Sequence, residues 1–224
     1  MTSTAELLEI GSDARRALVA AGSDVAAAGL SPGRSGNISA RLDDLLVMSP
    51  TNSDLAQLDA DALSVVTMDG VHVDGPTPSK EVPLHLALYR RDPHARAVVH
   101  VHSPFAVALS CREPWSAHCA IPPITPYFLL KVGQVPLVDY YAPGDPAQAD
   151  DVASNPWVFD AVLLANHGQI AAGTDFAAAV NSVIEVEEAA RTVLLQPDAA
   201  YRVLTEPQIL ELTSRGGTPW RVRR

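Results

Sequence analysis

Short apolar strands joined by tight turns are the feature that most constrains how this 224-residue chain folds. Residues 37–42 (NISARL) and 45–49 (LLVMS) read as two strands around a turn at Asp43-Asp44, and residues 161–173 (AVLLANHGQIAAG) read as strand, turn and strand. Further strands are predicted over residues 63–68, 95–102 and 135–141. Because a hairpin pairs its two strands antiparallel, the sheet should be mixed and largely antiparallel.

Helical patterns fill the segments between these strands. Candidate N-caps are Ser3 or Thr4, Ser103 and Asp175. Helices are predicted, in chain order, over about residues 4–28, 81–89, 103–111, within 122–133, within 143–155, and over 175–195 and 206–215. Strands and helices alternate without strict βαβ units, and no break in composition marks a second domain. The prediction is therefore one α/β sandwich domain over residues 1–224.

Composition narrows the class of protein. Hydrophobic residues make up 47% of the chain, which is enough for one sizeable core. The formal net charge of -10 argues against nucleic acids and anionic membranes as partners. The N-terminus is charged, unlike a signal peptide, and no apolar run reaches the roughly 20 residues of a membrane span. Cys111 and Cys119 suggest no disulfide framework, so we expect reduced thiols in a soluble cytoplasmic protein.

Three histidines are candidates for metal ligands. His100 and His102 lie two residues apart in AVVHVHSPF, so they share one face of a predicted strand. His167 follows another apolar strand, in LLANHGQI. Three imidazoles with one open position are typical of a catalytic zinc site. On spacing alone, ordinary buried or surface histidines remain an alternative.

Glu81 and His85 lie one turn apart at the start of a predicted helix. Glu81 could ligate a metal or act as a base, although a glutamate in a first turn is also stabilised by the helix dipole alone. We expect His85 either to orient a functional group or to pack in the core. The remaining histidines, in predicted turns and loops, should be solvated: His72, His94 and His118.

Three polar turns could together hold an anion. GRSGNIS (33–39) can present backbone N–H groups, and SPTN (49–52) and PS of PSKE (78–81) add hydroxyls. The alternative is that they are ordinary turns, since composition does not show that they meet in space. No nucleotide-binding glycine loop and no GxSxG nucleophile motif is present in the sequence.

In that order, GRSGNIS, SPTN, PSKE, HVH and NHG resemble the class II aldolase/adducin family over nearly the whole chain. The resemblance implies a three-layer α/β/α sandwich and a homotetramer with sites between subunits. It implies one divalent metal per subunit, held by His100, His102 and His167, with Glu81 as the acid/base that also touches the metal. The phosphate pocket that it implies is lined by Gly36, Asn37, Thr51 and Ser79.

PSKEVPLHLALYRRDP, ITPY and VPLVDYYAPGD are similar to one group of that family, the 3-oxo-tetronate 4-phosphate decarboxylases. Lys80 stands where aldolases more often carry serine, so it could orient the substrate's carboxylate or phosphate, or simply face solvent. Tyr127 matches a proton donor that aldolases take from a neighbouring subunit. Asn52 replaces the usual glycine of SPTG, and Arg34-Ser35 replaces small residues. Arg34 could be an extra phosphate donor or could signal a different anion, and Ser35 and Asn52 are further candidates for contact with the phosphate.

The chemistry that this resemblance implies is decarboxylation of 3-oxo-tetronate 4-phosphate to dihydroxyacetone phosphate through a metal-bound enediolate. Cleavage of a sugar 1-phosphate leaves the same enediolate, so a fuculose 1-phosphate type aldolase and a ribulose 5-phosphate 4-epimerase remain alternatives. A non-catalytic adducin-like interaction module is a further one. Zinc is the expected metal, although Mn²⁺, Co²⁺ and Fe²⁺ also bind imidazoles.

Overall fold

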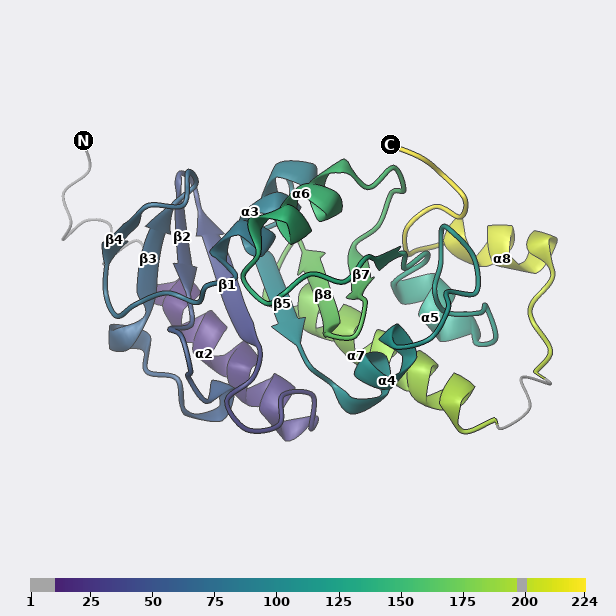
Figure 1. Ribbon diagram of the computed structural model, residues 1–224, viewed down its shortest axis with the longest axis horizontal. Coiled ribbons are helices and arrows are strands. Elements are labelled where there is room, and N and C mark those ends of the chain that lie inside the picture. Colours follow the sequence, from purple (N-terminus) through teal and green to yellow (C-terminus); the bar gives the residue numbers. More distant parts are fainter. Residues whose placement is uncertain (1–10, 197–200) are drawn as a thin grey trace.

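One eight-stranded sheet runs through the computed structural model, which describes residues 11–196 and 201–224 (Figure 1). The strands are β1 (Asn37–Leu42), β2 (Leu45–Met48), β3 (Ser64–Thr67), β4 (His72–Asp74), β5 (Ala97–Val101), β6 (Leu137–Val138), β7 (Ala161–Leu164) and β8 (Gly168–Gly173). Their order across the sheet is β4-β3-β2-β1-β5-β8-β7-β6. Only β6 and β7 pair parallel among these strands. The mixed, largely antiparallel sheet is confirmed.

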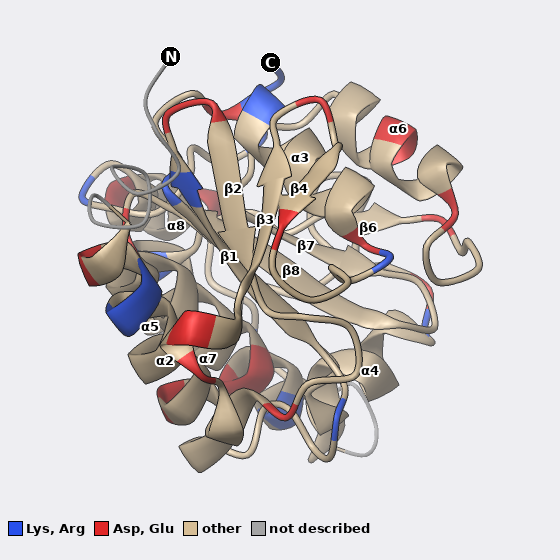
Figure 2. Cartoon of the chain, turned by 90° about the vertical axis from the view of Figure 1, so that its left-hand side faces the viewer, with Lys and Arg blue, Asp and Glu red and all other residues tan. Residues whose placement is uncertain are grey.

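Helices cover both faces of the sheet, and Figure 2 shows the sheet between the two helix layers. One layer holds α2 (Ser12–Ala27), α4 (Pro104–Ser110), α5 (Pro126–Lys131), α7 (Phe176–Leu194) and α8 (Glu206–Thr213). The other holds α3 (Val82–Arg91) and α6 (Pro146–Ser154). The three-layer sandwich is therefore confirmed.

The central strand β5 divides its side chains between two cores. Val99 and Val101 pack in the core under α2 and α7, whereas Val98 packs in the core under α3 and α6. Side chains two residues apart on a strand share a face, so His100 lies on the same side as Val98 and faces α3. The alternation of side chains along β5 therefore points His100, the first candidate ligand, toward α3, the helix that begins beside Glu81.

Most predicted elements are present in the described residues. The cap proposed at Ser3 or Thr4 lies outside the described residues. Strand β4 and two short 3-10 helices, Leu55–Gln57 and Ala60–Ala62, were not predicted. The strand predicted over 135–141 shrinks to β6, because Pro136 has no N–H and the chain leaves the sheet edge after Val138.

The prediction that His118 is solvated is wrong. The ring is buried, with its centroid 4.7 Å from that of Trp220 and 5.6 Å from that of Trp157. These tryptophans lie far from His118 in the chain, so a local reading could not find them. The prediction of reduced cysteines is confirmed, since Cys111 and Cys119 are free. Across the described residues, the structure holds no helix long and apolar enough to cross a membrane.

Candidate active site

The end of strand β5, which carries His100, is enclosed by two close backbones. β5 pairs with β1 on one side and with β8 on the other. A Cβ atom at Gly36 would lie 2.7 Å from the His100 carbonyl oxygen, and one at Gly168 would lie 2.6 Å from the Val101 carbonyl oxygen. Gly36 also has a φ of +84°, which disfavours other residues. Glycine at both positions therefore lets the neighbouring chains close on the histidine segment.

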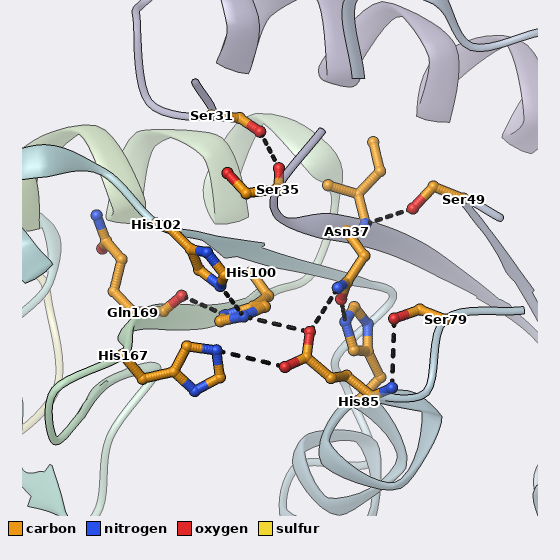
Figure 3. Close-up of polar contacts among 12 residues, drawn as sticks. Ser31, Ser35, Asn37, Ser49, Ser79, His85, His100, His102, His167 and Gln169 are labelled. Carbon is orange, nitrogen blue, oxygen red and sulfur yellow. Dashed lines mark hydrogen bonds and ion pairs between the residues drawn. The ribbon is translucent and has the colours of Figure 1, made fainter. Parts of the chain in front are cut away.

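Three imidazoles converge at this point (Figure 3). The ring centroids of His100, His102 and His167 lie 4.9, 5.0 and 4.8 Å apart. The ligand atoms that they offer all lie within 4.8 Å of one another. His100 comes from β5, His102 follows that strand, and His167 lies in the turn between β7 and β8. The structure brings together the three histidines that the sequence singles out.

The tautomer of His100 suits a metal ligand. Its Nδ1 lies 2.8 Å from the carbonyl oxygen of Gln169, which can only accept a proton, so Nδ1 carries the hydrogen. Burial lowers the pKa of His100 to about 4, so the ring is neutral near pH 7. Its Nε2 then presents a lone pair, 3.0 Å from His102 Nε2. A backbone carbonyl that fixes a ligand in this way is common at metal sites.

His167 supplies the test of whether a cation fits. Both of its ring nitrogens are buried and make no hydrogen bond among the described residues, and the nearest carboxylate oxygen to Nε2 is Glu81 Oε1, at 3.4 Å. Leaving a buried polar group unpaired costs about 1–3 kcal/mol. The ligand atoms of His100 and His102 lie within 4.8 Å of that of His167. A divalent cation is the partner that satisfies this set of nitrogens, and Zn²⁺, Mn²⁺, Co²⁺ and Fe²⁺ all accept imidazole ligands.

Glu81 lies against the histidine cluster as the N-cap residue of α3. Its Oε2 is 3.4 Å from His100 Nε2, and its Oε1 is 3.4 Å from His167 Nε2. Asn37 Nδ2 donates a hydrogen bond of 2.7 Å to Oε2. Burial alone would raise the pKa of Glu81, but the positive charge that His100 takes up in acid and the hydrogen bond from Asn37 hold the pKa well below its usual range. The carboxylate is therefore ionised at neutral pH.

A chain of buried polar groups continues from Asn37 away from the histidines. Asn37 lies opposite His100 in the β1–β5 register, so both side chains share a face. His85 Nε2 lies 2.5 Å from Asn37 Oδ1, and His85 Nδ1 lies 2.7 Å from Ser39 Oγ. Tyr89 OH lies 2.9 Å from Ser39 Oγ. His85 thus contacts a neighbour of Glu81, which fits one of the two roles expected for it, whereas Ser39 and Tyr89 were missed.

The three polar turns meet at one end of the sheet. Ser49 Oγ accepts a hydrogen bond from Ile38 N, which ties the second turn to the first. Pro50 and Pro78 form a β-bridge, and Thr51 N donates to Thr77 O at 3.0 Å, which ties the second turn to the third. Sequence patterns gave no sign of this proximity, because it depends on strand pairing. The turns therefore offer a common surface for an anion.

The predicted anion-binding residues differ in exposure. Arg34, Thr51 and Asn52 are exposed, whereas Ser79 is buried and its Oγ accepts a hydrogen bond from Glu81 N. Asn52 has a φ of 58°, the region where glycine is usual and where asparagine is tolerated best among other residues. Asparagine in place of glycine at this position is therefore compatible with the backbone conformation of the turn.

Lys80 and Tyr127 lie outside the histidine cluster. Lys80 is exposed, and its aliphatic stem would lie 3.1 Å from a Cβ atom at Gly144. Tyr127 is 64% exposed on α5, which packs against α7 and α8. A side chain so open to solvent is free to contact another molecule.

The chain belongs to the class II aldolase/adducin family. The family model described as "Class II Aldolase and Adducin N-terminal domain" matches residues 16–194. A protein of Pectobacterium atrosepticum named 3-oxo-tetronate 4-phosphate decarboxylase is 42% identical over 201 residues, which cover 89% of this chain and 92% of that protein.

Solved structures agree with this assignment. The crystal structure of YgbL from Escherichia coli is 40% identical, with a TM-score of 0.86 and coverage of 91% of this chain and 99% of that one. A structure of L-fuculose 1-phosphate aldolase is 26% identical, with a TM-score of 0.80 over 91% of this chain and 96% of that one. The fold is thus that of a class II aldolase.

Proposed function

We propose that this chain is a divalent-metal-dependent carbon–carbon lyase that decarboxylates 3-oxo-tetronate 4-phosphate to dihydroxyacetone phosphate and carbon dioxide. The observation that carries the proposal is the convergence of His100, His102 and His167 beside the ionised Glu81. The identity of 42% to a relative named for this activity, over 89% of the chain, supports the choice of reaction.

His100, His102 and His167 would hold one metal ion per subunit, and Glu81 would touch it when no substrate is bound. The chemistry supplied by such an ion is Lewis-acid polarisation of a substrate carbonyl. Zinc is our choice because it prefers imidazole ligands and leaves a coordination position open. Elemental analysis of the purified protein tests the choice against Mn²⁺, Co²⁺ and Fe²⁺.

Glu81 is the group that we assign to proton transfer. In the reaction, the bond between the carboxylate carbon and C2 breaks, carbon dioxide leaves, and the electron pair of that bond stays on the framework next to the C3 carbonyl. A proton must then be added to C2. Glu81 is the carboxyl group beside the histidines, and negative charge on the substrate would raise its affinity for a proton from water. Glu81 would pass that proton to C2.

The polar turns and Lys80 would hold the two anionic ends of the substrate. The phosphate pocket that we propose is formed by Arg34, Ser35, Gly36, Asn37, Thr51, Asn52 and Ser79. Lys80 would orient the carboxylate that is lost, a group that aldol substrates lack. Lys80→Ser should therefore raise KM for the oxo acid without lowering the melting temperature, and an unchanged KM would return Lys80 to a solvated role.

Tyr127 would act from a neighbouring subunit of a homotetramer, with the sites between subunits. The exposure of its side chain, 64%, supports a role outside its own subunit. Sedimentation analysis tests the tetramer. A cytoplasmic location is a further part of the proposal, and the free thiols of Cys111 and Cys119 support it.

A sugar-phosphate aldolase of fuculose 1-phosphate type is the second candidate, because the aldolase structure shares this fold at a TM-score of 0.80. The deciding experiment incubates the metal-loaded protein with phosphorylated 3-oxo acids, fuculose 1-phosphate and ribulose 5-phosphate. We expect carbon dioxide and dihydroxyacetone phosphate from an oxo acid. Aldehyde release from a sugar phosphate, with no carbon dioxide from any oxo acid, would replace the decarboxylase by the aldolase.

A further inference from the structure

The chain of hydrogen-bonded side chains behind Glu81 forms because the spacing of residues along α3 matches the spacing of residues along β1. Glu81, His85 and Tyr89 lie four residues apart along α3, and Asn37 and Ser39 lie two residues apart along β1. Four residues of helix advance about 6 Å, and two residues of strand advance about 6.7 Å. Because the two advances nearly agree, each strand residue lies between two helix residues. Asn37 contacts Glu81 and His85, and Ser39 contacts His85 and Tyr89.

The direction of each hydrogen bond follows from the contact between Asn37 and Glu81, in which Asn37 Nδ2 lies 2.7 Å from Glu81 Oε2. A carboxylate can only accept, so Asn37 must turn its NH₂ group toward Glu81. The carbonyl oxygen of Asn37 then faces His85 Nε2 at 2.5 Å and needs a donor there. Nε2 must therefore carry the proton of the imidazole ring. The close-up in Figure 3 shows His85 on the side of Asn37 away from the three converging rings.

Ser39, on the other side of His85, also fixes which ring nitrogen carries the proton. Burial lowers the pKa of His85 to about 3, so the ring is neutral and holds a single proton. With that proton on Nε2, Nδ1 is an acceptor, and Ser39 Oγ must donate to it across 2.7 Å. Tyr89 OH lies 2.9 Å from Ser39 Oγ and 3.0 Å from the Ser39 carbonyl oxygen, so its proton points toward Ser39 in either case.

These hydrogen-bonded side chains are also shielded from solvent. Ser39 and His85 are 0% exposed, Tyr89 is 1% exposed and Asn37 is 5% exposed. If a donor and an acceptor were exchanged here, no water could replace the lost hydrogen bond, and an unpaired buried polar group is costly. All donors therefore point one way, from Tyr89 toward Glu81, and the opposite tautomer of His85 would break two contacts at once.

We propose that His85, locked by Ser39 in the tautomer protonated on Nε2, is a positioning residue that holds Asn37, and through it the Glu81 carboxylate, in the orientation used for catalysis. The role assigned to Glu81 rests on the proposed function. The pattern of donors rests only on the residues of this chain.

The kinetic test compares His85→Gln with His85→Leu. The glutamine amide can place a donor where Nε2 stood, whereas leucine fills the space without one. We expect His85→Leu to lower kcat about 10- to 100-fold, with KM within about threefold, because groups that orient catalytic residues have effects of this size. His85→Gln should recover kcat to within about fivefold of wild type. Equal loss in both variants, or no loss in His85→Leu, would overturn the proposal.

His118→Leu is the matched control, since it removes another buried histidine that lies outside this chain of contacts. It should leave kcat unchanged even if it lowers the melting temperature. Should His85→Leu fail to fold, Ser39→Ala gives the same test, because it removes the donor to Nδ1 and leaves the ring in place. A Ser39→Ala protein with wild-type kcat would count against the proposal.

The tautomer itself is read by NMR of protein labelled with ¹⁵N-histidine, with the His85→Gln spectrum used to assign His85. We expect a protonated Nε2 and an unprotonated Nδ1 in the wild type, and a mixture of tautomers in Ser39→Ala. A ring protonated on Nδ1 would overturn the proposal whatever the enzyme does. If the tautomer is as expected but no substrate is turned over, the proposed function fails instead.

Discussion

Glu81 is 6% exposed and still ionised. Burial alone would raise the pKa of this carboxyl group, but the positive charge that His100 takes up in acid and the hydrogen bond from Asn37 keep the pKa low. Its two oxygens lie 3.4 Å from His100 and from His167, so a proton held by Glu81 is beside the cluster. The side chain is thus suited both to contact a cation and to transfer a proton.

Glu81→Gln separates these two roles. Glutamine keeps the volume and one oxygen acceptor for Asn37, but it cannot carry a proton between water and substrate. We expect the variant to retain metal and to lose at least about 100-fold in kcat, since general acid–base groups contribute about 10²–10⁴. Metal analysis and carbon dioxide release on one preparation measure both. A variant as fast as wild type would remove Glu81 from proton transfer.

His85 should make folding sensitive to acid. The folded ring has a pKa of about 3, lowered by burial, whereas the unfolded chain titrates near 6.5. Between these values the unfolded chain binds a proton that the folded chain excludes, so the free energy of unfolding falls as the pH falls from 6.5 toward 3. From pH 7 to pH 5, chelator-treated His85→Gln should lose roughly 1–2 kcal/mol less than wild type.

Urea unfolding of both proteins at the two pH values gives this difference directly. If wild type and His85→Gln lose the same free energy between pH 7 and pH 5, the ring is not a buried neutral imidazole. Removing the metal beforehand matters, because protonation of the other histidines would otherwise release it.

Residues with local signals were predicted well, and residues with distant partners were not. His100 and His102 stand out by their spacing within one strand, and Glu81 by its place at a helix start. Ser39 and Tyr89 look like ordinary strand and helix residues until the register brings them together. His118 lies in a turn as predicted, but it was wrongly expected to be solvated, because Trp157 and Trp220, which pack on its ring, come from distant segments.

At the scale of elements, the site depends on how closely β1 and the β7–β8 turn approach the end of β5. Both approaches use a glycine, Gly36 from one side and Gly168 from the other. The hairpins were predictable from their turns. The order β1-β5-β8 was not, because pairing between distant strands leaves no mark in either segment.

Gly168→Ala should move the turn that carries His167. The added Cβ would lie 2.6 Å from the Val101 carbonyl oxygen, so the turn must shift away from His102. We expect weaker metal binding, by about 10-fold or more, because ligand geometry sets affinity. Competition with a chromogenic chelator measures it.

Gly22→Ala is the control for that experiment. Its Cβ would also lie 2.6 Å from a backbone carbonyl oxygen, that of Leu55, but between α2 and a 3-10 helix. This variant should lose stability with unchanged metal affinity. Equal effects of the two variants on metal binding would show that general loosening, rather than the His167 turn, is responsible.

At the scale of the whole molecule, a three-layer sandwich leaves the polar turns and the histidine cluster at the ends of the strands, and Tyr127 exposed on a separate helix. A site between subunits would use both regions. The α/β sandwich was predictable from the interleaved strands and helices, whereas the three layers and the subunit arrangement were expected only from the family resemblance.

Mixed oligomers test the shared site. Glu81→Gln and Tyr127→Phe should each be poorly active alone. Unfolding and refolding them together in equal amounts should restore up to about one quarter of wild-type activity, because one site in four would then combine an intact Glu81 with an intact Tyr127 from a neighbour. No recovery in oligomers verified as mixed would place both groups on the same subunit, or remove Tyr127 from the reaction.

The central claim is that carbon dioxide release needs one divalent ion held by His100, His102 and His167. The most direct measurement strips the protein with a chelator, adds back Zn²⁺ in steps, and follows carbon dioxide release from 3-oxo-tetronate 4-phosphate. The account predicts no release at zero metal and a linear rise that ends at one ion per chain. Full activity in the stripped protein, or a rise that His167→Ala reproduces unchanged, would contradict it.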